Sequence, residues 1–366
     1  MKSISVIGIG RVGYNAVKYL VEDYNYEVLA IECIDKSKLL SGIGNTMFRR
    51  ACSPREALKY IEEEEPSLVG VALTSVVAKE YIEELLGNGY SIVDASYIDF
   101  DPYTYEELCR DNNVFYVVDA GFAPGFSNLV VGYVYDRVGE LDRVAIYVGG
   151  NPVEPKPPLY YEITWSARDL LEEYTRKARI VRNYQVLDVD PLEHVGRVEI
   201  PGKGVYEYFY SDGLHTLVRN IRAREMFEAT IRYPGHLEVI KLLRNLGFFD
   251  REPINIDGYS VKPIDFTAGL LEERFSQKSI DEAVLYIVIE KNNKYYRLLS
   301  ILRGIPGLSS IAKYTALVFA KTINIALEKG VRPGVIPLEH MHMYYRDYLE
   351  YLEKHGVVFS IETNTE

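Results

Sequence analysis

Three glycines near the start of the chain constrain its fold more than any other feature. Gly8, Gly10 and Gly13 follow an apolar run at residues 3–7 and open a helix-period segment at residues 12–24. With this spacing the first glycine permits a tight turn, the second admits a ligand against the backbone, and the third lets the helix pack closely on the strand. The pattern therefore predicts a strand–turn–helix unit with an anion site at the helix N-terminus.

Alternating strand and helix segments extend this pattern over the first 120 residues. We expect further strands at residues 26–32, 69–74, 91–94 and 114–118, and helices at 78–86 and 103–110. Strands that are continuously apolar are typical of a parallel sheet covered on both faces. Residues 1–130 are therefore predicted to form a Rossmann domain, with a doubly wound parallel sheet.

A second pattern begins near residue 142, where apolar and polar residues alternate, as in a sheet with one solvated face. The expected elements are strands at 144–148, 160–165, 197–200, 205–210, 227–232 and 283–290, and helices at 237–246, 309–328 and 339–355. The predicted fold class is α/β. It comprises the Rossmann domain, a second α/β domain with a mixed sheet at 131–305, and C-terminal helices within 306–366 that pack back on the Rossmann domain.

Composition narrows the classes of partner. The net charge of −12 argues against nucleic acid, whose phosphates are bound by clustered Lys and Arg. No apolar run approaches the roughly 18 residues of a membrane span, and the first residues lack a signal-peptide core, so we expect a cytoplasmic protein without a membrane partner. Cys33, Cys52 and Cys109 are odd in number and lack CxxC spacing, which predicts reduced thiols and no bound metal.

The glycine-rich turn predicts a site for the diphosphate of a dinucleotide. Its expected contacts are Gly8, Ile9, Gly10, Arg11, Val12 and Gly13. An acid about 20 residues further on should accept hydrogen bonds from the adenosine ribose. Glu32, at the end of a predicted strand, is favoured, and Asp35 is the alternative. Because a carboxylate repels a 2′-phosphate, NAD is predicted over NADP, unless Arg49 and Arg50 fold over the ribose.

Ligands of open α/β sheets bind beyond the carboxyl ends of the strands. Three segments follow predicted strands there, at residues 73–75, 94–97 and 119–125. The expected additional coenzyme contacts are Leu73, Thr74, Ser75 and Ser96. Asp94, Tyr97 and Asp119 offer groups that can hold or move a proton, although both aspartates could instead satisfy loop or helix-end amides.

Four further segments together resemble the saccharopine dehydrogenase and lysine 6-dehydrogenase family. They are residues 119–128 (DAGFAPGFSN), 161–169 (YEITWSARD), 211–217 (SDGLHTL) and 232–236 (RYPGH). The resemblance implies a Rossmann domain and a substrate domain with the active site between them. It also implies hydride transfer between NAD(P) and a carbon bearing an amine, in a homodimer or homotetramer that acts on a small amino-acid substrate.

The resemblance also assigns substrate contacts. In the family the loop matching Phe122, Ala123 and Pro124 lies beside the nicotinamide, and saccharopine-forming members typically carry an acid directly before its Pro-Gly. Ala123 occupies that position, which favours the lysine 6-dehydrogenase branch. Arg168 matches the arginine of a Trp-Ser-x-Arg motif that binds a substrate carboxylate. An ion pair with Glu172 or Glu173 is the alternative interpretation of Arg168.

Hydride transfer from an amine-bearing carbon requires a neutral nitrogen and therefore a base. Asp94, Tyr97, Asp119 and His215 are the candidates, and histidine alone has an ordinary pKa near neutral pH. Three hypotheses follow. The chain is an NAD-dependent enzyme that oxidises L-lysine at the ε-carbon, or a saccharopine-type enzyme acting on a secondary amine, or a regulator that senses NAD without turnover.

Overall fold

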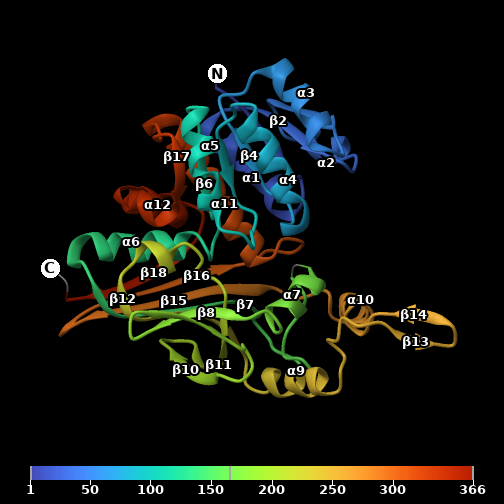
Figure 1. Cartoon of the computed structure of the whole chain (residues 1–366), viewed down its shortest axis with the longest axis vertical. Coiled ribbons are helices and arrows are strands. Elements are labelled where there is room, and N and C mark those ends of the chain that lie inside the picture. The colour runs from blue at the N-terminus through green and yellow to red at the C-terminus, as the bar shows by residue number, and fades with distance from the viewer. Residues whose placement is uncertain (1, 165, 365–366) are drawn as a thin grey trace. The chain divides into compact units, whose positions relative to one another are not determined.

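The computed structural model describes residues 2–164 and 166–364, and the chain divides into two units (Figure 1). The first unit comprises Met1–Tyr133 and Ala312–His355, and the second comprises Val134–Ile311 and Gly356–Glu366. Within the described ranges, no helix combines the length and the apolar character needed to cross a membrane.

The first unit contains a seven-stranded sheet in the order β17-β6-β5-β4-β1-β2-β3, in which every pair of neighbours is parallel. Its strands are β1 (Ser3–Ile7), β2 (Glu27–Glu32), β3 (Thr46–Arg50), β4 (Val69–Val71), β5 (Ile92–Asp94), β6 (Phe115–Val118) and β17 (Gly334–Pro337). The strand order reverses between β1 and β4, which is the switch point where such sheets bind ligands. The predicted doubly wound parallel sheet is confirmed.

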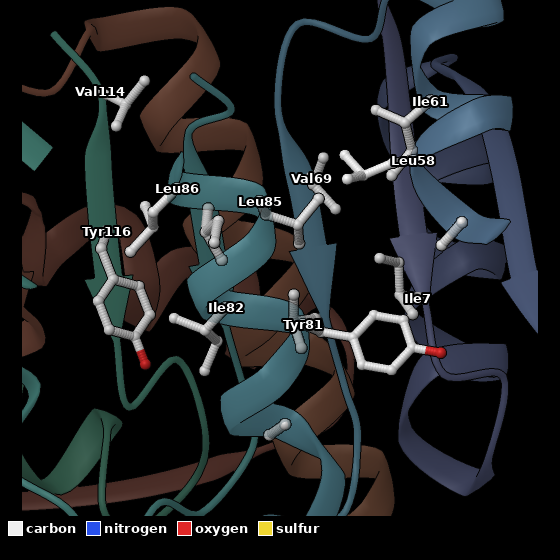
Figure 2. Close-up of a cluster of buried hydrophobic side chains, with 14 of the residues drawn as sticks. Ile7, Leu58, Ile61, Val69, Tyr81, Ile82, Leu85, Leu86, Val114 and Tyr116 are labelled. Atoms are coloured by element: carbon white, nitrogen blue, oxygen red, sulfur yellow. The ribbon is translucent and has the colours of Figure 1, made fainter. Parts of the chain in front are cut away.

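Helices cover both faces of this sheet. The helical segments are α1 (Arg11–Tyr24), α2 (Ser37–Leu40), α3 (Pro54–Glu64), α4 (Ser75–Gly87), η1 (Pro102–Tyr105), α5 (Glu106–Asp111), α6 (Phe126–Val138), α11 (Ser310–Lys329), η2 (Leu338–Tyr344) and α12 (Tyr345–Lys354). Figure 2 shows Ile82 and Leu86 of α4 beside Tyr116 of β6, in the core that α3, α4 and α5 close. On the opposite face, Gly70 of β4 leaves room for Phe319 of α11, which lies 2.9 Å from where a Cβ would stand.

The second unit contains a nine-stranded mixed sheet in which β12 and β7 are parallel and the other pairs are antiparallel. Its strands are β7 (Leu141–Pro152), β8 (Ala178–Arg182), β9 (Gln185–Val189), β10 (Val195–Ile200), β11 (Gly204–Ser211), β12 (Ala223–Arg232), β15 (Asp281–Lys291), β16 (Lys294–Arg303) and β18 (Val358–Thr363). The remaining elements are α7 (Ala167–Glu173), α8 (Leu217–Asn220), α9 (His236–Asn245), α10 (Pro263–Phe275) and a hairpin of β13 (Ile254–Ile256) and β14 (Tyr259–Val261). The predicted α/β unit with a mixed sheet is confirmed.

The predicted strand at residues 160–165 is wrong. Residues 160–164 form no strand, apart from an isolated bridge between Ile163 and Ser276, and Trp165 lies outside the described residues. Tyr160 has a left-handed backbone with φ of 53°, which is incompatible with an extended ladder. The alternating apolar residues of this segment, among them Tyr161 and Ile163, pack individually into the core without forming a strand.

Residues 306–366 are divided between the two units. Ala312–His355, which includes α12 and most of α11, does belong to the first unit. Strand β18, however, pairs with β16 from Tyr296↔Thr363 to Ile301↔Val358, within the sheet of the second unit. An edge strand exposes unpaired backbone groups, and β18 satisfies those of β16.

Candidate active site

The glycine-rich turn has the geometry of a dinucleotide cradle. A Cβ on Gly8 would stand 2.4 Å from the Ala72 carbonyl oxygen, and one on Gly13 would stand 1.8 Å from the Gly8 oxygen. These two glycines are therefore required by the fold itself. A Cβ on Gly10, in contrast, would meet no described atom within 4 Å. The fold thus leaves open the space at the one glycine that a ligand needs.

Helix α1 begins at this open position. Gly10 is its N-cap, no side chain of the described residues caps it, and no acidic residue lies in its first turn. The first intrahelical bond runs from the Tyr14 N–H to the Gly10 oxygen, at 3.0 Å. The backbone amides before Tyr14 and the positive end of the helix dipole favour an anion at this position. A dinucleotide diphosphate therefore fits there.

Glu32 touches the turn directly. Its Oε2 accepts a hydrogen bond from the Ile9 N–H at 2.9 Å, and its Oε1 accepts one from the Cys33 N–H at 2.8 Å. Oε1 also accepts from the Ile34 N–H at 3.5 Å, whereas Oε2 keeps a second lone pair with which it can accept a ribose hydroxyl. Asp35 is exposed and its Oδ1 accepts from the Ser37 N–H at 2.9 Å, so it serves the start of α2. The geometry favours Glu32 over Asp35 for a ribose contact.

The prediction of three reduced thiols is wrong, because Cys33 and Cys52 form a disulfide. Cys33 follows β2 and Cys52 lies two residues beyond β3, and these parallel neighbours end at the same edge of the sheet. An odd cysteine count does not exclude one pair, and the pairing could have been suspected once β3 was recognised. Cys109 is a buried free thiol in α5, and burial raises its pKa to about 12.

The three segments that follow predicted strands, at residues 73–75, 94–97 and 119–125, come together at the carboxyl edge of the parallel sheet. The Leu73 N–H donates to the Ser96 Oγ at 3.0 Å, and the Ala120 N–H donates to the Asp94 backbone oxygen at 2.8 Å. β4 ends at Val71 rather than at residue 74, so Leu73 lies in a turn and Thr74 is the N-cap of α4, which begins at Ser75. These hydrogen bonds join the segments after β4, β5 and β6.

Asp94 is the most perturbed acid of this edge. It is fully buried, its Oδ1 accepts from the Ser96 N–H at 2.8 Å, and its Oδ2 accepts from the Tyr116 hydroxyl at 2.9 Å. The pKa of Asp94 is raised to about 7, mainly by burial and to a smaller extent by the charge of Asp119. Sequence reasoning missed Tyr116. The available signal was a tyrosine in a buried strand, whose hydroxyl must find a partner.

The loop after β6 is compact. Asp119 is buried with a left-handed φ of 58°, and the Gly121 N–H donates to its backbone oxygen at 2.8 Å. Phe122 is buried and stacks on Tyr314, with ring centroids 4.3 Å apart. Its main role is therefore packing, whereas Ala123 and Pro124 are half-buried and can present atoms to a ligand. Tyr97, after β5, is also half-buried.

Arg168, in the second unit, is already engaged by two acids. Its Nε lies 3.2 Å from Glu172 Oε1 and its Nη1 contacts Asp265. This is the alternative considered for Arg168, with Glu172 rather than Glu173 as the helical partner. A substrate carboxylate would have to compete with these two side chains for the guanidinium.

His215 lies in the second unit, whereas Asp94, Tyr97 and Asp119 lie in the first. His215 is buried and has a left-handed φ of 42°. Its neighbours in the 211–217 segment have clear structural partners. Asp212 accepts from Arg179 Nε at 2.7 Å and from Arg179 Nη2 at 3.0 Å. The Glu228 carboxylate fills the space where a Cβ on Gly213 would stand.

The 232–236 segment builds a buried polar cluster that sequence reasoning did not foresee. Arg232 lies 4.4 Å over the Tyr161 ring and 3.3 Å from Glu173 Oε2. His236 pairs through Nε2 with the Tyr174 hydroxyl at 2.7 Å and through Nδ1 with the Leu159 oxygen at 2.6 Å. Burial lowers the pKa of His236 to about 3, so the ring is neutral. Across residues 2–164 and 166–364, no three His, Cys, Asp or Glu side chains gather as metal ligands would.

The model of the saccharopine dehydrogenase C-terminal domain matches residues 121–357. The chain is 23% identical over 249 residues to alpha-aminoadipic semialdehyde synthase of Arabidopsis thaliana, which covers 63% of this chain and 23% of that protein. It is 24% identical over 268 residues to the Schizosaccharomyces pombe saccharopine dehydrogenase [NADP(+), L-glutamate-forming], covering 68% of this chain and 59% of that one.

The chain thus spans 23% to 59% of the length of these curated relatives. Among solved structures, the apo histidine-tagged saccharopine dehydrogenase (L-Glu forming) from Saccharomyces cerevisiae is similar, with a TM-score of 0.81 and 16% sequence identity. That similarity covers 99% of this chain and 100% of the other. At this identity it supports the fold.

Proposed function

Because the chain belongs to the saccharopine dehydrogenase family, we propose that it is an oxidoreductase that transfers a hydride between a nicotinamide dinucleotide and an amine-bearing carbon of an amino acid. The observation that carries the proposal is the open space at Gly10, beside an uncapped helix N-terminus at the switch point of the sheet. The family match supports the amine chemistry, because both curated relatives are named for saccharopine or aminoadipic semialdehyde.

Coenzyme binding falls to the first unit. We assign the diphosphate to the backbone of residues 10–13, because the Gly8 N–H already donates to the Ile31 oxygen and the Ile9 N–H to Glu32. Glu32 accepts from the adenosine ribose. The further proposed contacts follow the ends of β4 and β5 and are Leu73, Thr74, Ser75 and Ser96. We propose NAD as the coenzyme, because the Glu32 carboxylate would repel a 2′-phosphate. Arg49 lies 3.9 Å from Glu64, and Arg50 donates to the Cys33 oxygen at 2.8 Å, so both guanidinium groups have partners within the chain.

When bound, the nicotinamide accepts or donates the hydride. The protein must hold the reacting carbon, exclude water and take up a proton from the substrate amine. Asp94 is suited to the proton step because its pKa of about 7 lets it change protonation near neutral pH. Ser96 and Tyr116 fix its two oxygens, and Tyr97 and Asp119 lie on the neighbouring segments as further candidates. His215 and Arg168 are proposed contacts of the second unit.

Two amines are proposed as substrates. L-lysine oxidised at the ε-carbon is favoured by Ala123, which stands where saccharopine-forming members typically carry an acid. Saccharopine, a secondary amine, is favoured by the names of the curated relatives. The relative from S. pombe is named for NADP(+), so both coenzymes belong in the test.

The test is an absorbance assay for reduced coenzyme. Purified full-length chain is incubated with NAD or NADP and with L-lysine or saccharopine, and Gly10→Ala serves as the matched inactive control. We expect reduction of NAD by one of the two amines and none by the control. Coenzyme binding without reduction by any amino acid supplied would overturn the enzyme proposal and support a sensor of the NAD redox state.

A further inference from the structure

The Cys33–Cys52 disulfide lies at the rim of the proposed coenzyme site. Cys33 directly follows Glu32, whose carboxylate accepts from both the Ile9 and the Cys33 N–H groups. The disulfide is therefore one residue away from the acid proposed to bind the adenosine ribose. Both cysteines are exposed to solvent. Exposed disulfides tend to be the labile and regulatory ones, in contrast to buried structural bridges.

The ladder between β2 and β3 ends at the pair Glu32↔Arg50, and the disulfide ties together the segments that follow the two strands. The Arg50 Nε donates to the Cys33 oxygen at 2.8 Å, and the Ala51 N–H donates to the Glu32 oxygen at 3.2 Å. The residues between β2 and β3 include α2, which has only four residues. The disulfide thus adds a covalent link directly after Glu32, the last residue of β2.

A reductant can reach this bond. A cavity of about 650 Å³ opens beside Cys52, and its walls combine cationic, anionic and aromatic side chains. The lining residues are Arg50, Cys52, Glu56, Lys59, Tyr60 and Glu63. The Cys52 N–H donates to Glu56 Oε2 at 2.8 Å, which orients this cysteine at the edge of the cavity.

We propose that the Cys33–Cys52 pair is a reversible redox site that couples thiol state to coenzyme affinity; this inference rests on the proposed function. A dithiol reductant supplies two electrons. One of its thiolates attacks a protein sulfur and displaces the other as a thiolate, which takes a proton. Its second thiol then closes on the mixed disulfide and releases the second protein thiol. The protein gains two thiols, and the reductant becomes a disulfide.

Reduction weakens binding because it frees the segment that begins at Cys33, whose N–H holds the Oε1 of Glu32. In the oxidised chain Glu32 is held in place for the ribose before coenzyme arrives. In the reduced chain part of the binding free energy is spent in ordering that segment. We expect the Kd for NAD to rise about tenfold, equivalent to about 1.4 kcal/mol.

The test measures binding and thiol content on the full chain. NAD affinity is determined by titration calorimetry on air-oxidised protein and on protein reduced with dithiothreitol, at a temperature where circular dichroism shows both to be folded. Thiols are counted after denaturation. We expect one thiol, Cys109, and tight binding in the oxidised sample, and three thiols and about tenfold weaker binding in the reduced sample.

Variants separate the disulfide from other effects of the reductant. The Cys33→Ser/Cys52→Ser double variant should bind NAD with the weaker affinity whether or not dithiothreitol is present. Cys109→Ser should respond like the wild type. Equal NAD affinity of the one-thiol and three-thiol samples would overturn this inference alone, as would three thiols in the oxidised protein. No NAD binding in either state would overturn the proposed function as well.

Discussion

Asp94 is the side chain on which the proposed chemistry depends most closely. It is buried with both oxygens hydrogen-bonded, and burial moves its pKa from the ordinary range of aspartate to about 7. Above that pH it is an ionised acceptor in a low-dielectric site, and below it the group is neutral. Strongly shifted acids at the carboxyl edge of a parallel sheet are typical of functional sites.

Asp94→Asn should therefore remove the pH dependence of turnover near neutrality. Asparagine keeps acceptor and donor positions for Ser96 and Tyr116 but cannot take up a proton. In the wild type we expect kcat/KM to rise with pH through an apparent pKa near 7, and in the variant to lie about 100-fold lower without that limb. An unchanged pH profile in the variant would assign the titration to another group.

Asp94→Asn should lower kcat/KM, but its stability relative to the wild type should increase as the pH rises. Because the folded-state pKa is raised, the folded chain retains the Asp94 proton between pH 4 and 7 while the unfolded chain has lost it. The contribution of this group is fully present below about pH 4 and disappears as the pH rises through about 7. The free energy of unfolding of Asp94→Asn should therefore gain on the wild type between pH 4 and 8, as urea titrations at both pH values can measure. A constant difference would contradict the raised pKa.

Two arginines of the second unit should respond differently to removal of their charge. Arg232 is buried and its loss leaves Glu173, only 18% exposed, without its cation. Arg232→Met should destabilise the chain by about 3–5 kcal/mol. Arg168 is 38% exposed, so Arg168→Met should cost less than about 1 kcal/mol while raising KM if it contacts a substrate carboxylate. Thermal melts and steady-state kinetics distinguish the two. Similar melting temperatures would contradict the structural role of Arg232.

Two glycines of the turn before α1 serve different purposes: the fold requires Gly13, and a bound ligand requires Gly10. A Cβ at position 13 would collide with the Gly8 oxygen, whereas a Cβ at position 10 would point into open space. Gly13→Ala should therefore lower the melting temperature sharply. Gly10→Ala should leave it within a few degrees of the wild type but abolish NAD binding by obstructing the diphosphate. The measurements are differential scanning calorimetry and NAD titration, and unimpaired NAD binding by Gly10→Ala would place the coenzyme elsewhere.

The elements that sequence patterns predicted are those with strong periodicity or apolar runs. β1, α1, β2 and the strands at the switch point emerged in this way, because buried parallel strands consist almost entirely of apolar residues. The edge strands β3 and β18 escaped prediction because their residues are half-buried or exposed and carry no buried run. β17 is buried, but it has only four residues, the first a glycine and the last a proline.

The sequence predicted those residues of the candidate site whose role depends on the local backbone. It did not predict the side chains that are paired across neighbouring strands. Gly8, Gly10 and Gly13 follow from spacing alone, and the end of a predicted strand favoured Glu32 over Asp35. The partnership of Asp94 with Tyr116 joins β5 to β6, and the Cys33–Cys52 disulfide joins the ends of β2 and β3. Each depends on which strands are neighbours in the sheet, and that order is not written in the local sequence. The role of Arg232 was hidden for the same reason.

At the scale of the whole chain, each unit has a hydrophobic core of its own, and the family match runs from the loop after β6 to the end of α12. The match therefore includes residues of both units. The proposed coenzyme site lies in one unit, and Arg168 and His215 lie in the other. The activity should therefore be tested on the full chain, which is also the form in which a predicted homodimer or homotetramer would assemble.

If a hydride leaves an amine-bearing carbon for the nicotinamide, a deuterium placed on that carbon should appear in the reduced coenzyme. The full chain is incubated with NAD and with L-lysine deuterated at the ε-carbon, or with saccharopine deuterated at the carbons that bear its secondary amine. The reduced coenzyme is then analysed by mass spectrometry. We expect one deuterium in the reduced coenzyme from one of these amines, and no reduced coenzyme with Gly10→Ala. Reduced coenzyme that carries no deuterium, or no reduced coenzyme from either amine, would contradict it.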